Sequence, residues 1–114
     1  MAGAIGLFRG PMHVLEWAND ELLALVPRDC VGIPVRECFP EDEFAESQVA
    51  MDDCLRSGKY ICVARPLGIL WLGPRRDARG RVYGVASHFQ LAPLPADVRP
   101  PTILRVPHLE VVGN

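Results

Sequence analysis

The sequence lacks the features that mark several large classes of protein. No apolar run approaches the roughly 20 residues that a helix needs to cross a bilayer, and the first residues lack the charged region and long apolar core of a secretory signal. The formal net charge is only −2, so no excess of positive charge indicates nucleic acid or an anionic membrane as a partner. We therefore expect a cytoplasmic protein that binds neither of them.

Motifs for catalysis are also missing. The chain has no G-x-S-x-G, no P-loop, no H-E-x-x-H and no glycine-rich dinucleotide turn. Three consecutive acids at 41–43 suit the first turn of a helix, where the helix dipole favours negative charge. An isomerase-like cavity would need a buried carboxylate base, and no acid falls at a predicted inward position. We expect no catalytic residue and no enzymatic activity.

The four cysteines show no metal-binding pattern. Cys30, Cys38, Cys54 and Cys62 have no C-x-x-C spacing and no histidine in a finger-like arrangement, so no metal site is predicted. In a reducing compartment such residues usually pack as small apolar side chains, and this is our interpretation here. A redox-sensing thiol is the alternative.

What the chain does have is the length and composition for one core. It has 114 residues, 49% of them apolar and 23% charged, which is ordinary for a globular domain. The composition changes after residue 92, where five prolines between 93 and 107 forbid a helix. We predict a domain over 1–92 and a proline-rich extended arm over 93–114, with 102–106 and 109–112 able to form strands.

Periodicity and breakers predict the order of the elements. Strands are expected at 4–9, 12–18, 59–67, 68–73 and 81–91, a helix between Asn19 and Pro27, a helical turn at 35–40 and a longer helix from 41 to Gly58. Asn19 is a strong N-cap, because its side-chain oxygen can accept a free backbone N–H of the first turn. Gly58 suits a left-handed cap. The arginine-rich loop at 74–80 contains an Asp-x-x-Gly turn, so we interpret it as a solvated hairpin tip rather than a phosphate site.

This order and five short motifs resemble the PAS family. The motifs are Trp17-Ala18-Asn19, Val31-Gly32-Ile33-Pro34 with Phe39-Pro40-Glu41, Ser57-Gly58-Lys59, the segment 72–80, and Val82-Tyr83-Gly84-Val85. The resemblance covers about residues 4–92. It implies an α+β fold, in which helices cover one face of a five-stranded antiparallel sheet. It also implies a sensory domain that acts through a homodimer or on a signalling protein in trans.

The usual PAS cofactors have no anchor in this sequence. Val35 stands where light-oxygen-voltage domains carry their flavin-reactive cysteine, and the helix at 41–58 has no histidine for haem. Glu41 stands where photoactive yellow proteins attach their chromophore to a cysteine. We expect no flavin, haem or thioester chromophore.

Strand alternation sorts the last two strands into faces. The resemblance implies that Leu70, Leu72, Gly84 and Ala86 point toward the helices, and the small residues among them leave room there. Two alternatives follow: a cavity for a small apolar ligand, or a core that Phe39, Phe44 and Met51 fill. The candidate ligand contacts are Phe39, Met51, Arg65, Leu70, Leu72, Gly84, Ala86 and His88. Arg65 and His88 are the polar members that would orient a ligand.

The opposite face of the same strands carries larger side chains. Trp71, Tyr83, Val85 and Phe89 would form an apolar patch of the kind that marks an interface, and we predict a homodimer through them. The sequence thus leaves two functions open. One is a sensor for a small apolar ligand, and the other is a ligand-free interaction module or a fragment of a larger regulator.

Overall fold

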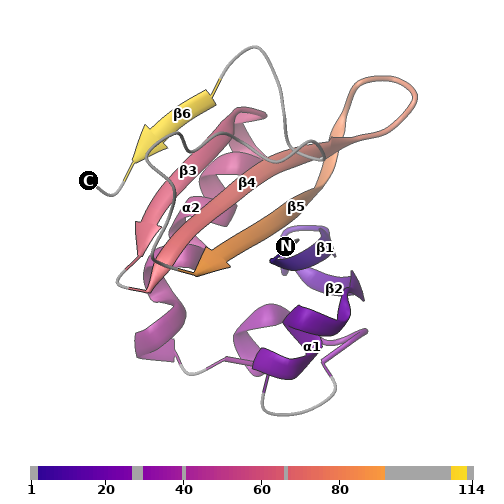
Figure 1. The fold of residues 1–114 in the computed structure, drawn as a ribbon. Coiled ribbons are helices and arrows are strands. Elements are labelled where there is room, and N and C mark those ends of the chain that lie inside the picture. Colours follow the sequence, from indigo (N-terminus) through magenta and orange to yellow (C-terminus); the bar gives the residue numbers. More distant parts are fainter. Residues whose placement is uncertain (1–2, 27–29, 40, 66, 92–108, 113–114) are drawn as a thin grey trace.

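The computed structural model describes residues 3–26, 30–39, 41–65, 67–91 and 109–112. The elements, in chain order, are β1 (Ala4–Arg9), β2 (Val14–Ala18), α1 (Asp20–Leu25), the 3-10 turn η1 (Val35–Glu37), α2 (Glu41–Ser57), β3 (Tyr60–Arg65), β4 (Gly68–Arg76), β5 (Val82–Leu91) and β6 (Leu109–Val112). This is the expected order (Figure 1). The predictions for Pro27, Pro40 and residues 92–108 fall outside the described residues.

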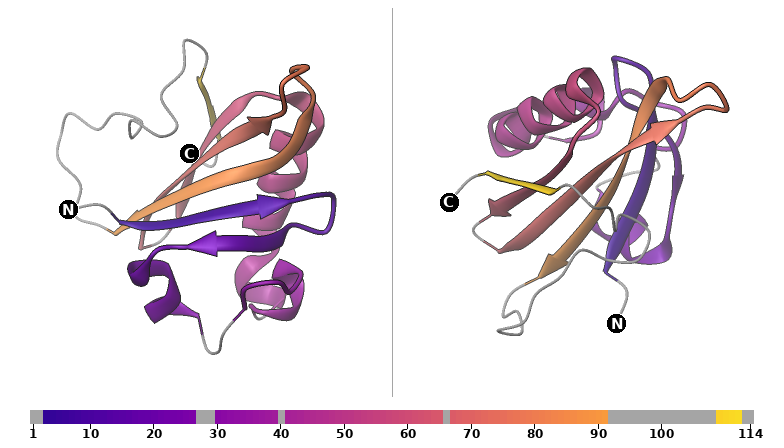
Figure 2. Two further views of the ribbon diagram at one scale, coloured as in Figure 1. Left: turned by 90° about the vertical axis from the view of Figure 1, so that its right-hand side faces the viewer. Right: turned by 90° about the horizontal axis from the view of Figure 1, so that it is seen from above.

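The strands form one sheet in the order β2-β1-β5-β4-β3-β6. The pairs formed among β1 to β5 are all antiparallel, which confirms the predicted five-stranded sheet. β6 adds a sixth strand, parallel to β3, with Leu109 opposite Tyr60. Figure 2 shows α2 along one face of the sheet. We call this the helix face and the opposite side the outer face.

Asn19 fixes the start of α1, as its position predicts. Its side-chain oxygen accepts the backbone N–H of Leu22 at 3.0 Å and that of Ile5 at 3.0 Å. Its amide nitrogen donates to the carbonyl of Gly3 at 2.8 Å. One side chain therefore caps α1 and ties it to β1.

The longer helix ends as predicted, at a glycine in the left-handed region. Gly58 has φ +71°, and its N–H donates to the carbonyl of Cys54 at 2.9 Å. Phe44, Gln48 and Leu55 are half-buried and Met51 is buried, so the predicted apolar stripe of α2 faces the sheet.

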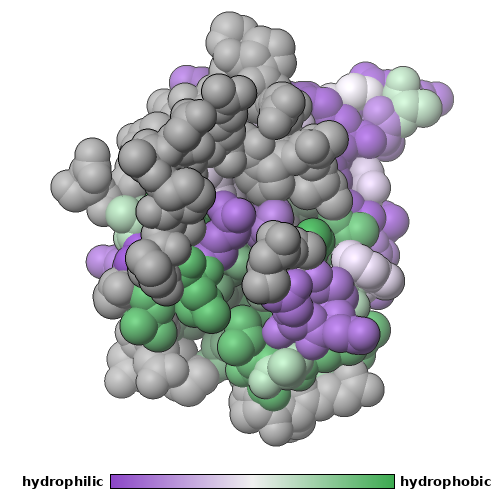
Figure 3. All heavy atoms as spheres, in the orientation of Figure 1, coloured by the Kyte–Doolittle hydropathy of each residue, from purple (hydrophilic) through white to green (hydrophobic). Residues whose placement is uncertain are grey.

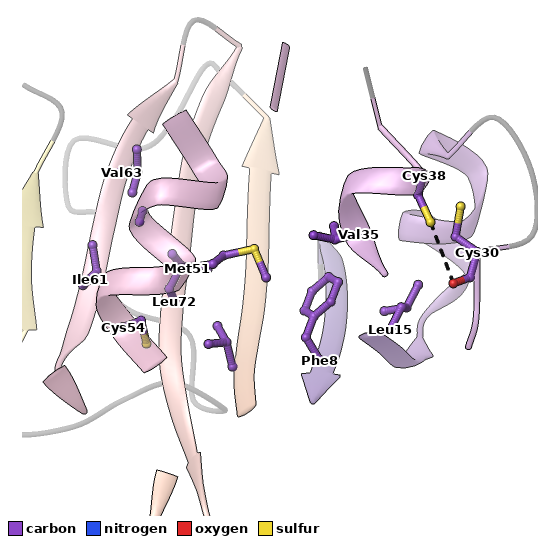
Figure 4. Close-up of a cluster of buried hydrophobic side chains, with 12 residues drawn as sticks. Phe8, Leu15, Cys30, Val35, Cys38, Met51, Cys54, Ile61, Val63 and Leu72 are labelled. Atoms are coloured by element: carbon purple, nitrogen blue, oxygen red, sulfur yellow. Dashed lines mark hydrogen bonds between the residues drawn. The ribbon is translucent and has the colours of Figure 1, made fainter. Parts of the chain in front are cut away.

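The main core lies between the helices and the helix face. It contains Phe8, Leu15, Met51, Ile61 and Leu72 with seven further buried residues (Figure 4). A smaller cluster of Cys62, Trp71 and Ala86 lies on the outer face. All four cysteines are buried and free, so the expectation that they pack as small apolar side chains is confirmed.

The β4–β5 hairpin is polar, and Figure 3 shows hydrophilic atoms gathered over it at the upper right. The carboxylate of Asp77 accepts the backbone N–H groups of Arg79 at 2.8 Å and Arg81 at 3.0 Å, so the tip is a side-chain-closed turn. Among the described residues, no helix is both long and apolar enough to span a membrane.

Candidate ligand-binding site

A cavity of about 340 Å³ lies between the helix face and the two helices. Its walls are Ala4 and Phe8 from β1, Leu22 and Leu25 from α1, Phe39, Phe44, Ser47 and Met51 from the η1–α2 region, Arg65 and Leu67 around the β3–β4 turn, Leu70 from β4, and Ser87 and Phe89 from β5. The volume is within the range of small-molecule sites. The fold therefore leaves a space that the core does not fill.

The strand register builds the floor of this cavity. Phe89 of β5 lies opposite Leu70 of β4 on one side and opposite Ala4 of β1 on the other. Residues directly opposite on antiparallel strands share a face, so these three side chains form one row on the helix face. In the next row Ser87 lies opposite Gly6, where an added Cβ would come within 2.7 Å of Leu22 Cδ2. The lack of a side chain at Gly6 thus lets α1 approach the sheet.

Two aromatic rings form part of the helical wall. The rings of Phe39 and Phe44 stack with their centroids 5.0 Å apart and 12° between their planes. Phe44, Ser47 and Met51 follow one another at three- and four-residue intervals along α2, which places them on one face of that helix. This wall is apolar except for the serine.

Three polar side chains in the described part of the chain line the cavity. Ser47 and Ser87 are buried, and the hydroxyl of Ser87 donates to the Gly6 carbonyl over a long 3.4 Å. The guanidinium of Arg65 donates to the carboxylate of Glu46. The Arg65 side chain is 19% exposed and that of Glu46 80%, so the pair spans the boundary between the cavity and solvent.

The structure brings together half of the predicted ligand contacts. Phe39, Met51, Arg65 and Leu70 line the cavity. Leu72 points to the helix side as predicted, but it is fully buried in the core. That Phe39, Met51, Arg65 and Leu70 bind a ligand stays a prediction.

The predicted facing of the last strand is wrong. Ala86 clusters with Trp71 on the outer face, and His88 lies directly opposite Trp71. Gly84 alternates with them on β5 and so belongs to the same side. The physical reason for a small residue at Gly84 is the neighbouring strand, because a Cβ there would lie 2.1 Å from the Phe8 carbonyl oxygen. Gly84, Ala86 and His88 therefore do not border the cavity.

Because the two faces of β5 are exchanged relative to the prediction, the predicted exposed patch does not form. Val85 is fully buried in the main core and Phe89 lines the cavity, so neither points outward. Trp71 does lie on the outer face, but only 3% of it is exposed, and its indole N–H donates to Gln90 Oε1 at 3.0 Å. Tyr83 lies beneath the guanidinium groups of Arg9 and Arg75, 4.7 and 4.8 Å from its ring centroid.

Glu16 organises those two arginines. Its carboxylate accepts hydrogen bonds from Arg9 Nε and, at 2.9 Å, from Arg75 Nη1. These bonds, first that of Arg9 and then that of Arg75, lower the pKa of Glu16 below its usual value. These charged and aromatic groups interact with one another on the surface. The position of Tyr83 is therefore explained without a partner protein.

A larger hollow of about 610 Å³ lies on the other side of α2, over β3. Its lining includes Val49, which is 68% exposed, and the carboxylates of Asp52, Asp53 and Glu46. Each carboxylate already has a cationic or histidine partner within the chain. This hollow is an open surface groove, and the smaller cavity is the better candidate site.

Sequence reasoning missed several residues of the cavity. The predicted contacts do not include Ala4, Phe8, Leu22, Leu25, Ser47, Leu67, Ser87 and Phe89, nor Phe44, which is expected only to fill the core if no cavity forms. Strand alternation is an available signal for Ser87 and Phe89, because they lie on the face of β5 opposite to Gly84, Ala86 and His88. Assigning that other face to the helices would identify both residues.

Comparisons place this fold among known structures. No family model matches the chain, and no curated protein matches its sequence. Among solved structures the chain is similar to a Vibrio cholerae VqmA dimer, a LuxR-type receptor in the absence of its target DNA, with a TM-score of 0.67 and 22% identity over 81% of this chain and 48% of that one. VqmA bound to DPO has a TM-score of 0.65 and 24% identity, over 82% and 54% of the two chains. A VqmA–ligand–DNA complex has a TM-score of 0.62 and 20% identity, over 80% and 46%.

These likenesses show the fold. The chain has the PAS-like α+β architecture that its motifs predicted, with an antiparallel sheet and α2 packed on one face. It spans about half the length of the VqmA chains.

Proposed function

We propose that this chain is a PAS-type sensory domain that binds a small, mostly apolar molecule in the cavity, signals by a change in shape, and has no enzymatic activity. The observation that carries this proposal is the cavity itself. Of its described lining residues, all except Ser47, Arg65 and Ser87 are apolar, and they come from several helices and strands around it. An apolar space with a few polar groups is the usual composition of a small-molecule site.

The first helix is the part that a ligand would move. α1 has six residues and none of them is buried. Leu22 and Leu25 face the cavity, and Leu25 is still 53% exposed. A ligand in contact with both would bury apolar surface that the free protein leaves in water, at about 25 cal/mol per Å². Binding would therefore stabilise α1 against the sheet and change the surface that it presents.

The solved structures support this proposal at the level of the fold. VqmA is described as bound to DPO and as a dimer that acts on target DNA. We infer that this chain has a comparable sensory role and acts through self-association, through a signalling protein in trans, or as part of a larger regulator.

The absence of enzymatic activity is part of the proposal. The described lining residues of the cavity include no histidine, cysteine, tyrosine, lysine or carboxylic acid. Acid–base chemistry needs a donor or acceptor that titrates near the working pH. The site is better suited to holding a molecule than to changing it.

A ligand-free docking module is the second candidate function. Trp17 is 49% exposed on the edge strand β2, and it lies opposite Leu7 on the outer face. Exposed tryptophan is typical of protein interfaces. This residue, rather than Trp71, is the aromatic side chain available for a partner.

The test compares the wild type with a variant whose cavity is filled. Ser47→Leu places an apolar side chain in the cavity without adding charge. The purified proteins are denatured and the released small molecules are identified by mass spectrometry, and melting temperatures are measured with a metabolite panel. We expect a released molecule or a ligand-induced rise in the wild type and neither in Ser47→Leu. A wild type that releases nothing and gains no stability from any compound would favour the docking module.

A further inference from the structure

The position of Arg65 gives the cavity one positive end. Ile61, Val63 and Arg65 lie opposite Leu72, Leu70 and Gly68, and therefore all share the helix face. Arg65 is the last residue of β3, so its side chain enters at the end of the cavity. Its cross-strand neighbour is Gly68. This position requires glycine, because a Cβ there would lie 1.9 Å from the carbonyl oxygen of Gln90.

The charges at this end are distributed unequally. The Arg65 side chain is 19% exposed and lines the cavity, whereas its partner Glu46 is 80% exposed and does not line it. None of the described lining residues is acidic. The guanidinium of Arg65 therefore lines the cavity, whereas the carboxylate of Glu46 lies mostly in solvent.

An ion pair of this kind is weak and can be replaced. Its acidic partner is largely hydrated, so solvent screens much of the attraction between the two charges. A ligand carboxylate inside the cavity would meet the same guanidinium with less competing water, and the planar fork of arginine matches both carboxylate oxygens. The exchange would release Glu46 to solvent, where it is already almost fully hydrated.

We propose that the cavity takes a small monocarboxylate with an apolar body, and that its carboxylate replaces Glu46 on Arg65. This deepens, and rests on, the proposed ligand-binding function. The apolar body would lie between the stacked rings of Phe39 and Phe44 and the strand residues Leu70 and Phe89. Replacement of Glu46 couples occupancy to α2, because Glu46 loses its bond to the sheet when the ligand binds.

The lining also selects against other charges. A dianion would leave one negative charge without a cation, since Arg65 is the single cation among the described lining residues. A cationic ligand would face Arg65 directly and find no carboxylate among the described lining residues. Burying an uncompensated charge is costly, so one negative charge on the ligand fits this site best.

Isothermal titration calorimetry with matched probes tests this inference. The probes are hexanoate and 3-phenylpropionate, each compared with the corresponding alcohol, hexan-1-ol or 3-phenylpropan-1-ol. The proteins are the wild type, Arg65→Met, Glu46→Gln and the control Arg56→Met. Arg56 pairs with the neighbouring acid Asp53 but lies outside the cavity.

We expect the wild type to bind at least one carboxylate ten-fold or more tightly than its alcohol. Arg65→Met should lose this preference while keeping its affinity for the alcohol, which also shows that the variant is folded. Glu46→Gln should bind the carboxylate a few-fold more tightly, because the competing group is gone. Arg56→Met should behave like the wild type.

Two results would overturn the inference, and they differ in what else they overturn. Equal affinity for acid and alcohol, unchanged in Arg65→Met, would refute the carboxylate and leave the ligand-binding function standing. Failure of every probe to bind the wild type and Glu46→Gln would count against both.

Discussion

His13 Nε2 lies 2.7 Å from Asp52 Oδ1, and this hydrogen bond joins the turn before β2 to the middle of α2. His13 is fully buried and has a left-handed backbone with φ +52°, which is uncommon for a residue other than glycine. Its carbonyl also accepts the N–H of Val35 at 3.1 Å. One histidine thus connects the hairpin, η1 and the long helix.

Removing Asp52 should destabilise the fold. Asp52→Ala would leave the buried Nε2 of His13 without a partner, at a cost of about 1–3 kcal/mol. Asp53→Ala is the matched control, because it removes only an exposed ion pair with Arg56 and should cost less than about 1 kcal/mol. Urea unfolding followed by circular dichroism measures both. Equal stabilities of the two variants would show that the His13 contact contributes no more than the exposed ion pair.

The register of β5 against β1 can be tested at Gly84. Gly84→Ala puts a Cβ 2.1 Å from the Phe8 carbonyl oxygen, which the backbone cannot easily avoid, so we expect a loss of about 3 kcal/mol or more. Gly6→Ala should cost less, since its Cβ meets side chains rather than backbone: the flexible end of Leu22 at 2.7 Å and the ring of Phe8 at 3.1 Å. Melting temperatures rank the variants. A Gly84→Ala protein as stable as the wild type would contradict the described strand pairing.

Cys54 makes the fold sensitive to alkali. Burial, together with the nearby charge of Asp53, raises the pKa of its thiol from 9.0 to about 12. The folded state therefore holds the proton more tightly than the unfolded state, and stability present below pH 9 is lost as the pH rises from 9 toward 12. The loss attributable to Cys54 approaches about 1.4 kcal/mol per pH unit.

The comparison that isolates this effect uses Cys54→Ala. The variant is less stable at neutral pH, because a buried side chain is truncated, but its stability should fall less steeply above pH 9. Urea midpoints at several pH values give both slopes. Parallel curves for the two proteins would show that Cys54 titrates alike in the folded and unfolded states.

Introducing a charge at each of the two tryptophans should affect different properties: the stability of the fold at Trp71 and self-association at Trp17. Trp71→Glu buries a carboxylate in the outer cluster and should destabilise the fold by about 4 kcal/mol or more. Trp17→Glu changes a half-exposed side chain, so stability should stay within about 1 kcal/mol while self-association weakens. Sizing with light scattering and urea unfolding separate these effects. A stable Trp71→Glu monomer would restore the interface predicted from the sequence.

Local chemistry made most of the fold predictable. Asn19 and Gly58 act through their own side-chain or backbone properties, so their roles can be deduced from a few neighbouring residues. The turn at Asp77 is predictable for the same reason. These signals fixed the order of the elements, and with it the resemblance to PAS domains.

Long-range register was not predictable. Alternation divides β5 into two sets but does not say which set faces the helices, and a shift of one residue exchanges them. The small residue Gly84 suggested space for a ligand, whereas it makes room for the backbone of β1. The bulge between Arg75 and Arg76 changes the pairing of β4 with β5, and the pairing of β6 with β3 joins residues about 50 positions apart. No local pattern encodes either.

The methyl resonance of Met51 tests the central claim, that the cavity admits a small apolar molecule, most directly. The chain has three methionines, of which Met51 lines the cavity and Met12 is 42% exposed on the β1–β2 turn. In protein labelled with ¹³C at the methionine methyls, titration with toluene should shift the Met51 signal saturably and leave that of Met12 in place. A Met51 signal that does not move, or that moves in parallel with Met12, would contradict the account.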